Sequence, residues 1–318
     1  MAFDLQVFNK QTYIAATETI AQDVAKFNEA SAGAITLANN PAHGDFDLTA
    51  SFKAISGLVR RRNVDSNAVV AAKRLEQLLN ASVKVAAGTP PIEYTPAQYA
   101  WVLQNPELAA LKIGEQLAKA RIADMLNTGV RAAVAAVKGN AALVEGDGTA
   151  VPTFRLLNKG AARFGDRSGS IRAWVMHSTT VHGLYDSALA NVEQLFTYEG
   201  VNVMRDPFGR LFVVTDSDAL VDTSGANPVY RTVGLVENGV VVNGNDDFNS
   251  VIVPTTGKEN IGATYQAEWS YNVGLLGYTW DTTSGGKSPN DTALGTSTNW
   301  DKSASSDKDT AGVLIQTK

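Results

Sequence analysis

The sequence predicts an α+β protein in which one very long helix lies beside several strands. Three observations predict this class. Residues 106–138 carry apolar side chains at helical spacing over their whole length. Runs rich in β-branched and aromatic residues precede and follow this helix. The chain has 318 residues, of which 44% are hydrophobic and 19% are charged, a composition typical of a folded protein.

The first 40 residues are expected to contain a short extended piece and then a helix. The stretch AATETIAQDVAKFNEAS, residues 15–31, has helical character but is polar for its length. A polar helix near a chain end often lies on something else rather than in a core of its own. Residues 1–50 carry two lysines against six acids, which gives a net charge of −4.

Residues 41–95 are predicted to form a basic, two-stranded excursion. The runs GAITLAN at 33–39 and GDFDLTASFKAI at 44–55 are predicted strands. Between 51 and 84, seven bases against two acids give +5, beside the acidic first segment. This contrast indicates electrostatic pairing, either within one chain or between chains. Such an excursion buries too little apolar surface to be stable alone, so neighbouring copies are expected to complete it.

The ends of the long helix carry recognisable signals. Asn105 is a suitable N-cap, Pro106 suits the first helical position, and Glu107 complements the positive end of the helix dipole. Gly139 is predicted to end the helix in the left-handed conformation. A helix over 106–138, at roughly 1.5 Å per residue, forms a rod of about 50 Å.

Two glycines interrupt the interior of this helix. Gly114 and Gly129 each cost about 1 kcal/mol relative to alanine, which indicates close packing or a bend. The apolar residues that repeat at helical spacing are Leu108, Leu111, Ala118, Ile122, Met125, Leu126, Val130, Ala133, Val134 and Val137.

The segment from 152 to 250 is predicted to be α/β. Its expected elements are a helix at 152–166, a buried strand at 171–178, a helix at 179–191, two strands around a turn at 201–217 and a hairpin at 231–244. Residues 261–280 are aromatic-rich with strand character, and the polar remainder is expected to be loops that end in a strand at 312–315. No fixed-period repeat is found.

Composition excludes several classes of function. The chain has no cysteine, which excludes disulfides, thiolate metal sites, cysteine nucleophiles and iron–sulfur clusters. Its net charge of −5 argues against a protein that wraps nucleic acid. The stretch MAFDLQVFNK lacks the pattern of a signal peptide, and no run of 18 apolar residues predicts a membrane span.

Residues 172–191 are the first candidate for chemistry. His177, Ser178, His182 and Asp186 include the residue types of a Ser–His–acid site. However, His177 and Ser178 are neighbours in a predicted strand, so their side chains diverge, and no G-x-S-x-G elbow surrounds the serine. The histidines are five residues apart, whereas zinc-binding pairs on a helix are three or four apart. We expect a strand end followed by a helix capped by Ser178 or one of the two threonines after it.

Four further stretches predict no catalytic, cofactor or metal site. The run SGGKS at 284–288 lacks the first glycine of a phosphate loop, because position 281 is aspartate. The acidic runs at 216–222 and 243–249 lack the spacing of a calcium loop and are expected to be solvated. The triple arginine at 60–62 is weak evidence for nucleic-acid binding in an acidic chain, so a protein contact is expected there.

The order of these parts resembles a known family. Three pieces carry the resemblance: ARFGDRSGSIRAWVMHSTTVHGL at 162–184, TYQAEWSYNVGLLGYTWD at 264–281, and SPNDTALGTSTNWDK with KDTAGVLI near the end. On these pieces the chain resembles the major capsid protein of a tailed double-stranded DNA bacteriophage, with the Hong Kong 97-type fold. The resemblance covers nearly the whole chain in order.

The resemblance implies a division of the chain into five parts. They are an N-terminal arm at 1–40, an extended loop at 41–95, a peripheral domain at 96–169 with the spine helix 106–138, an axial domain at 170–250, and a return to the peripheral domain with the C-terminal segment at 251–318. It also implies intersubunit contacts on the loop, which we assign to Arg60, Arg61, Arg62, Lys73 and Arg74.

The implied function is structural rather than enzymatic. Copies are expected to assemble as hexamers and pentamers into an icosahedral head that encloses double-stranded DNA without sequence-specific binding, and no cofactor is implied. Implied partners are a separate scaffolding protein, a portal protein, a terminase and decoration proteins, with no membrane. The location is the virion capsid, assembled in the host cytoplasm. Two alternatives stay open: a bacterial nanocompartment shell, and a soluble α/β hydrolase using His177, Ser178 or His182.

Overall fold

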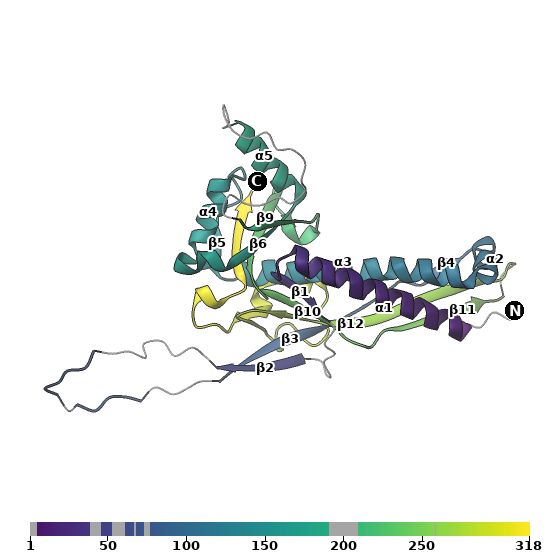
Figure 1. Ribbon diagram of the computed structural model, residues 1–318, viewed down its shortest axis with the longest axis horizontal. Helices are drawn as coiled ribbons and strands as arrows, with labels where there is room; N and C mark the ends of the chain where they lie inside the picture. Colours follow the sequence, from purple (N-terminus) through teal and green to yellow (C-terminus); the bar gives the residue numbers. More distant parts are fainter. Residues whose placement is uncertain are drawn as a thin grey trace.

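The chain forms an elongated body with a second lobe and a projecting loop (Figure 1). The computed structural model describes residues 5–38, 46–52, 61–66, 68–72, 77–190, 209–257 and 259–318. In these parts the fold is α+β, as predicted, and it is organised around two sheets and one long helix. No helix within these ranges is both long and apolar enough to cross a membrane.

The larger sheet has seven strands and runs along the body. Its central strand β12 is 14 residues long, so different neighbours pair with different parts of it. β10 and β11 share one side of β12, whereas β3 and β4 share the other. The strands are β1 (Ile35–Ala38), β2 (Phe46–Phe52), β3 (Gln77–Gly88), β4 (Ile92–Tyr94), β10 (Val240–Gly244), β11 (Asn249–Thr255) and β12 (Gly262–Leu275). The predicted strands at 33–39 and 44–55 are thus confirmed as β1 and β2.

The long helix α3 (Pro106–Lys138) has the predicted bounds, but its ends differ from the prediction. Asn105 makes no side-chain cap for α3, because its amide donates to the carbonyl of Trp101 and it ends the preceding helix α2 (Pro96–Gln104). Gly139 is right-handed, with φ −64°, rather than left-handed. A Cβ on Gly139 would lie 3.3 Å from the carbonyl oxygen of Ala136, so space rather than handedness favours glycine there.

Both interior glycines of α3 mark close packing. A Cβ on Gly114 would lie 2.8 Å from the Cβ of Ala15, in the helix α1 (Leu5–Ala30) that lies along α3 (Figure 1). A Cβ on Gly129 would lie 3.0 Å from the Cγ1 of Val240 on β10. The long helix therefore packs closely against α1 at Gly114 and against the larger sheet at Gly129, and glycine permits each close approach. The polar helix α1 does lie on another element, namely α3 of its own chain.

The smaller sheet builds the second lobe. Its strand order is β5-β15-β9-β6-β7, and β8 also pairs with β9. The strands are β5 (Val144–Glu145), β6 (Ile171–Met176), β7 (Leu211–Val214), β8 (Val221–Asp222), β9 (Val229–Val236) and β15 (Gly312–Thr317). The helices α4 (Phe154–Ala162) and α5 (Ser178–Ala190) belong to the same lobe (Figure 1). β7 pairs in parallel with β6, and residues 201–208 of its predicted partner lie outside the described residues.

The predicted hairpin at 231–244 is wrong. β9 lies in the smaller sheet, whereas β10, only four residues later, lies in the larger one. The turn between them is tight: Asn238 has φ +53°, and a Cβ on Gly239 would lie 2.7 Å from the carbonyl oxygen of Ala311. The two strands pair with other partners because the chain crosses here from one sheet to the other.

The smaller sheet contains strands from outside residues 170–250, the predicted axial domain. β5 precedes that range and β15 follows it, and β15 pairs with β9 over six residues. Three further elements follow β12 and precede β15 along the chain. They are the strand β13 (Tyr278–Trp280), the short helix α6 (Asp291–Leu294) and the strand β14 (Trp300–Lys302), which pairs with β13. Large buried aromatic side chains, including Trp174, Tyr271 and Trp280, fill the core. The five-part division itself stays a prediction.

Candidate assembly surfaces

The tip of the projecting loop is exposed throughout. We define the tip segment as residues 61–66 and 68–72, and every one of these residues is exposed. It lies apart from the rest of the described chain, beyond β2 and β3 (Figure 1). Arg61 and Arg62 are therefore available to another molecule. The other predicted contact residues, Arg60, Lys73 and Arg74, lie outside the described residues.

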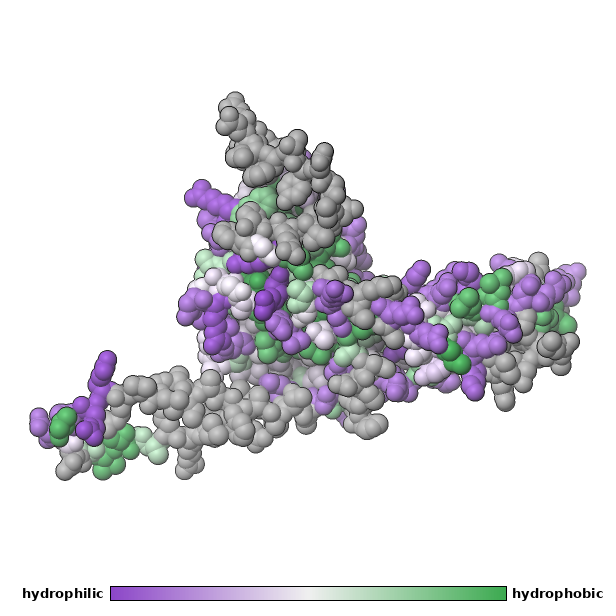
Figure 2. Space-filling model, in the orientation of Figure 1, coloured by the Kyte–Doolittle hydropathy of each residue, from purple (hydrophilic) through white to green (hydrophobic). Residues whose placement is uncertain are grey.

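A hollow lies at the opposite end of the body. This distal groove, of about 570 Å³, is lined by side chains that include Ile92, Tyr94, Trp101, Val102, Lys112 and Ile113. It forms where β4, α2 and the start of α3 meet, because a capping box on Thr95 starts α2 directly after β4. Figure 2 shows hydrophobic side chains gathered among polar ones at this end of the molecule.

Two residues of the predicted apolar repeat of α3 are exposed near the start of this helix. Leu108 is 49% exposed and Leu111 is 45% exposed. In the first turns of α3, Ala109 and Ala110 are fully buried, whereas Leu108 and Leu111 lie on an exposed side of the helix. Helical spacing predicts an apolar face but does not say whether a core or another molecule covers it.

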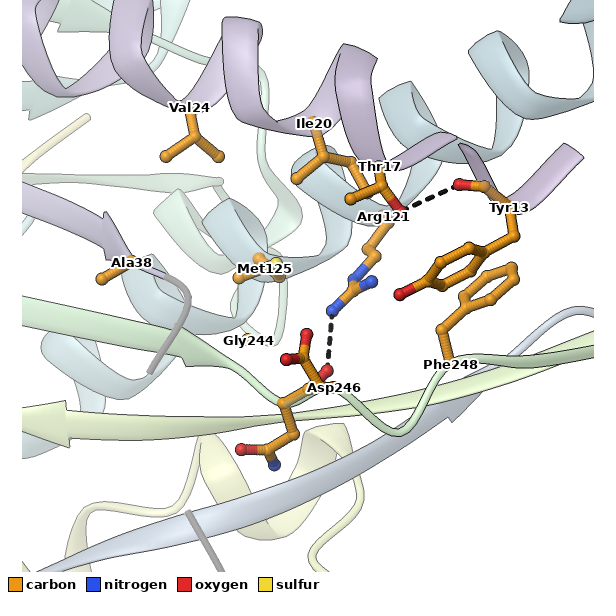
Figure 3. Close-up of a pocket in the computed structure, with 11 residues that line it drawn as sticks. Tyr13, Thr17, Ile20, Val24, Ala38, Arg121, Met125, Gly244, Asp246 and Phe248 are labelled. Atoms are coloured by element: carbon orange, nitrogen blue, oxygen red, sulfur yellow. Dashed lines mark hydrogen bonds between the residues drawn. The ribbon is translucent and has the colours of Figure 1, made fainter. Parts of the chain in front are cut away.

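A small cavity lies under α1 (Figure 3). It has a volume of about 100 Å³ and lies between Tyr13, Ile20 and Val24 of α1 and Arg121 of α3. Arg121 is only 8% exposed, and its Nη2 donates to the carbonyl of Asn245 at 3.4 Å. Burial lowers the pKa of Arg121, although the nearby charge of Asp247 opposes this shift. The guanidinium thus ties α3 to the loop that joins β10 to β11.

Asp247 anchors the same loop. It accepts hydrogen bonds from the backbone N–H and the hydroxyl of Ser270, and it lies 3.5 Å from Lys84. Partial burial works against ionisation, but these contacts outweigh it and hold the pKa of Asp247 below its usual range. The acidic run at 243–249, expected to be solvated, therefore contains a structural carboxylate.

The His–Ser stretch is a strand end followed by a helix, as predicted, but the cap is a different residue. The N–H of Thr179 donates to Nδ1 of His177 at 3.1 Å, so the imidazole caps α5 in place of Ser178. The N–H of Ser178 donates to Asp216 at 3.2 Å, and Nε2 of His177 lies 3.5 Å from the same carboxylate. His182 is exposed.

This geometry does not form a hydrolytic site. Hydrolysis needs a serine hydroxyl bonded to the histidine, with the acid on the far ring nitrogen. Here the hydrogen bonds of Ser178 go to Asp216 instead, and they lower the pKa of that carboxyl group. In the part of the chain that the structure describes, no group of three or more metal-ligating side chains is placed to hold a metal ion.

The comparison with protein families identifies what these surfaces belong to. A model of the major capsid protein 13-like family (Gp13-like) matches residues 4–314. The chain belongs to this family. It is therefore a structural shell protein of a phage head and not an enzyme. The nanocompartment and hydrolase alternatives are set aside by this finding.

The comparison with solved structures finds phage capsids at low sequence identity. The capsid of Helicobacter pylori bacteriophage KHP30 is 11% identical, with a TM-score of 0.48 over 90% of this chain and 88% of that chain. A chain of Microbacterium phage Oxtober96 is 10% identical, with a TM-score of 0.49 over 91% of each chain. The capsid of Ralstonia phage GP4 is 9% identical, with a TM-score of 0.48 over 89% of this chain and 87% of that chain. No curated protein matches the sequence.

Proposed function

We propose that copies of this chain assemble as hexamers and pentamers that close into an icosahedral head around double-stranded DNA. The observation that carries this proposal is the projecting loop, whose exposed tip segment has no support from its own chain in the described residues. A loop of one copy that binds a different surface of its neighbour makes a heterologous contact. Such contacts close into a ring when the rotation that relates neighbouring copies divides a full turn evenly.

The charges of the loop indicate how it holds a neighbour. Arg61 and Arg62 are exposed, and Arg60, Lys73 and Arg74 are close to them in sequence. Arginine forms planar, bidentate pairs with carboxylates, and the chain as a whole carries 32 acids against 27 bases. We assign all five bases to intersubunit charge pairs, which supply orientation and specificity more than net affinity.

The remaining partners follow from the demands of a closed container. Heterologous contacts alone permit shells of several sizes, so a separate scaffolding protein sets the size. A portal protein and a terminase admit the DNA, and decoration proteins bind the finished surface. A net charge of −5 suits a wall that DNA must not adhere to. Assembly takes place in the host cytoplasm, and the five-part division into arm, loop, peripheral domain, axial domain and return describes the roles within each copy.

Particle mass and shape test the proposal. The recombinant protein is examined by light scattering and negative-stain microscopy, with and without a candidate scaffolding protein from the same phage. Rings of five and six copies, or closed shells, are the expected result. A chain that stays a monomer of 33.7 kDa under all conditions, scaffold included, contradicts the proposal.

A further inference from the structure

The cavity under α1 contains a buried hydrogen-bond donor that the fold leaves unused. Arg121 is only 8% exposed, and Figure 3 shows its side chain reaching from α3 into the space between α1 and the loop after β10. Its Nη2 donates to the carbonyl of Asn245, but its Nε is buried and makes no hydrogen bond. A buried N–H without an acceptor costs free energy, so an acceptor that enters this cavity relieves that cost.

The surroundings of Arg121 favour an acceptor that carries a negative charge. Burial lowers the pKa of the guanidinium, because the charged form is poorly solvated there. Two acids lie near it. Asp247 is engaged by Ser270 and Lys84, as described above. Asp246 is exposed, so water and salt screen its charge. A carboxylate inside the cavity is screened much less and interacts more strongly with the guanidinium.

The rest of the cavity suits a short apolar chain. Apolar side chains from α1, α3 and the loop after β10 line it: Ile20, Val24, Met125 and Phe248. An apolar cavity of about 150 Å³ takes a molecule the size of benzene, so one of about 100 Å³ suits roughly four to six heavy atoms. A segment of polypeptide needs more room than this, so the occupant is a free small molecule.

We propose that this cavity binds a small monocarboxylate with a short apolar chain, whose carboxylate accepts a hydrogen bond from Nε of Arg121. The chain of the ligand packs between Ile20 and Val24 of α1 and Met125 of α3. The bound molecule contacts α1, α3 and the loop after β10 together, so it holds α1 against the body. This site does not depend on how copies of the chain assemble.

The four methionines of the chain provide a probe of the cavity. Met125 lines it, whereas Met176 is buried on β6 in the smaller sheet. The unassembled chain is isotope-labelled at its methionine methyl groups, and butyrate is titrated while the methyl signals are recorded by NMR. Met125→Leu and Met176→Leu assign the two signals. The control titrants are n-butanol, which has the same chain without the charge, and sodium chloride.

Butyrate is expected to shift the Met125 signal to saturation and to leave the Met176 signal in place. The affinity for n-butanol should be about tenfold lower or weaker still, because a hydrogen bond between charged partners is stronger than one to a neutral hydroxyl. Ala38→Leu adds apolar bulk to the wall of the cavity and keeps Arg121, so it should abolish the shift. Arg121→Gln should lower the affinity for butyrate to that for n-butanol.

Equal affinity for butyrate and n-butanol, or an equal shift with sodium chloride, overturns the assignment of a carboxylate ligand. A Met125 signal that does not move, or that moves no more than the Met176 signal, overturns the site itself. An undiminished shift in Ala38→Leu does the same. If either variant does not fold, the titrations of the unmodified chain still decide between these results.

Discussion

At the scale of single residues, α3 has glycine at its interior positions 114 and 129 because a neighbouring element leaves no room for a Cβ, and this outweighs the poor helix propensity of glycine. In an open helix Gly114→Ala would gain about 1 kcal/mol. Here the added Cβ would lie 2.8 Å from Ala15 and 2.9 Å from the backbone oxygen of Thr12. Backbone atoms cannot turn aside, and overpacking of this kind costs about 1–3 kcal/mol.

We therefore expect Gly114→Ala to loosen α1 from α3 despite its better helix propensity. The free energy of unfolding of the unassembled chain, measured with urea, should fall by about 1 kcal/mol or more, and α1 should become more sensitive to protease. Gly169→Ala is the matched control, since nothing lies within 4 Å of its new Cβ. A Gly114→Ala variant as stable as Gly169→Ala would show that the two helices are not in contact.

A second residue-scale prediction concerns a half-buried carboxyl group on α3. Asp124 accepts a hydrogen bond from the hydroxyl of Tyr271 at 2.8 Å, and that hydroxyl also lies 2.9 Å from the hydroxyl of Thr128. Burial raises the pKa of Asp124, although the hydrogen bond from Tyr271 opposes the shift. The folded state therefore holds this proton more tightly than the unfolded state does. Its contribution to stability is present below the unfolded pKa and is lost as pH rises through the folded pKa.

Asp124→Asn keeps an acceptor for Tyr271 and removes this pH-dependent loss. Urea unfolding at several pH values should show the variant gaining stability relative to the unmodified chain as pH rises through the acidic range. Asp247→Asn provides the opposite sign, because the pKa of Asp247 is lowered: its deficit should be greatest at neutral pH and should shrink on acidification. A constant difference for Asp124→Asn at every pH would contradict the assigned direction.

At the scale of elements, the start of α5 depends on one imidazole. His177 accepts from the N–H of Thr179, and its ring also lies 5.3 Å from the ring of Tyr230. We expect His177→Ala to lower the free energy of unfolding by about 1 kcal/mol or more, the usual cost of a lost N-cap. His177→Asn restores a capping acceptor and should recover part of that loss. His182→Ala, at an exposed position of the same helix, should change thermal unfolding little; a large loss there with none at position 177 would refute the cap.

The same scale shows what the sequence could and could not predict. The bounds of α3 and the strands β1 and β2 followed from periodicity, because local patterns determine them. The separation of β9 from β10 did not, since short spacing predicts a hairpin and only the partners of each strand assign it to a sheet. The same limit explains why Asn105, the predicted N-cap of α3, ends α2 instead. It also explains why Leu108 and Leu111, which belong to the apolar repeat, are exposed. No local signal separates an apolar face that meets a core from one that meets another molecule. The groove was missed for this reason. The burial of Arg121 was missed because its hydrogen-bond partner, the carbonyl of Asn245, lies 124 residues away in sequence.

At the scale of the whole molecule, the charges of the loop should affect assembly with neighbouring copies but not the stability of the folded chain. Reversing both exposed arginines, Arg61→Glu with Arg62→Glu, removes two positive charges from the tip segment and adds two negative ones. The described tip residues carry no core contacts, so the variant should unfold at the same urea concentration as the unmodified chain. Its assembly with the scaffold, measured by light scattering, should slow at least tenfold, because the loop then carries negative charges where the proposed charge pairs with carboxylates of the neighbour need positive ones.

Two comparisons separate this effect from a general change in net charge. Arg155→Glu reverses an exposed arginine on α4, in the other lobe, and should assemble nearly as fast as the unmodified chain. Salt should slow assembly of the unmodified chain, because exposed charge pairs are screened beyond roughly 10 Å at 0.1 M. It should affect the double variant less, since that variant has lost the attraction that salt screens. If the double variant assembled as fast as Arg155→Glu, the charges of the loop would have no part in holding neighbouring copies together.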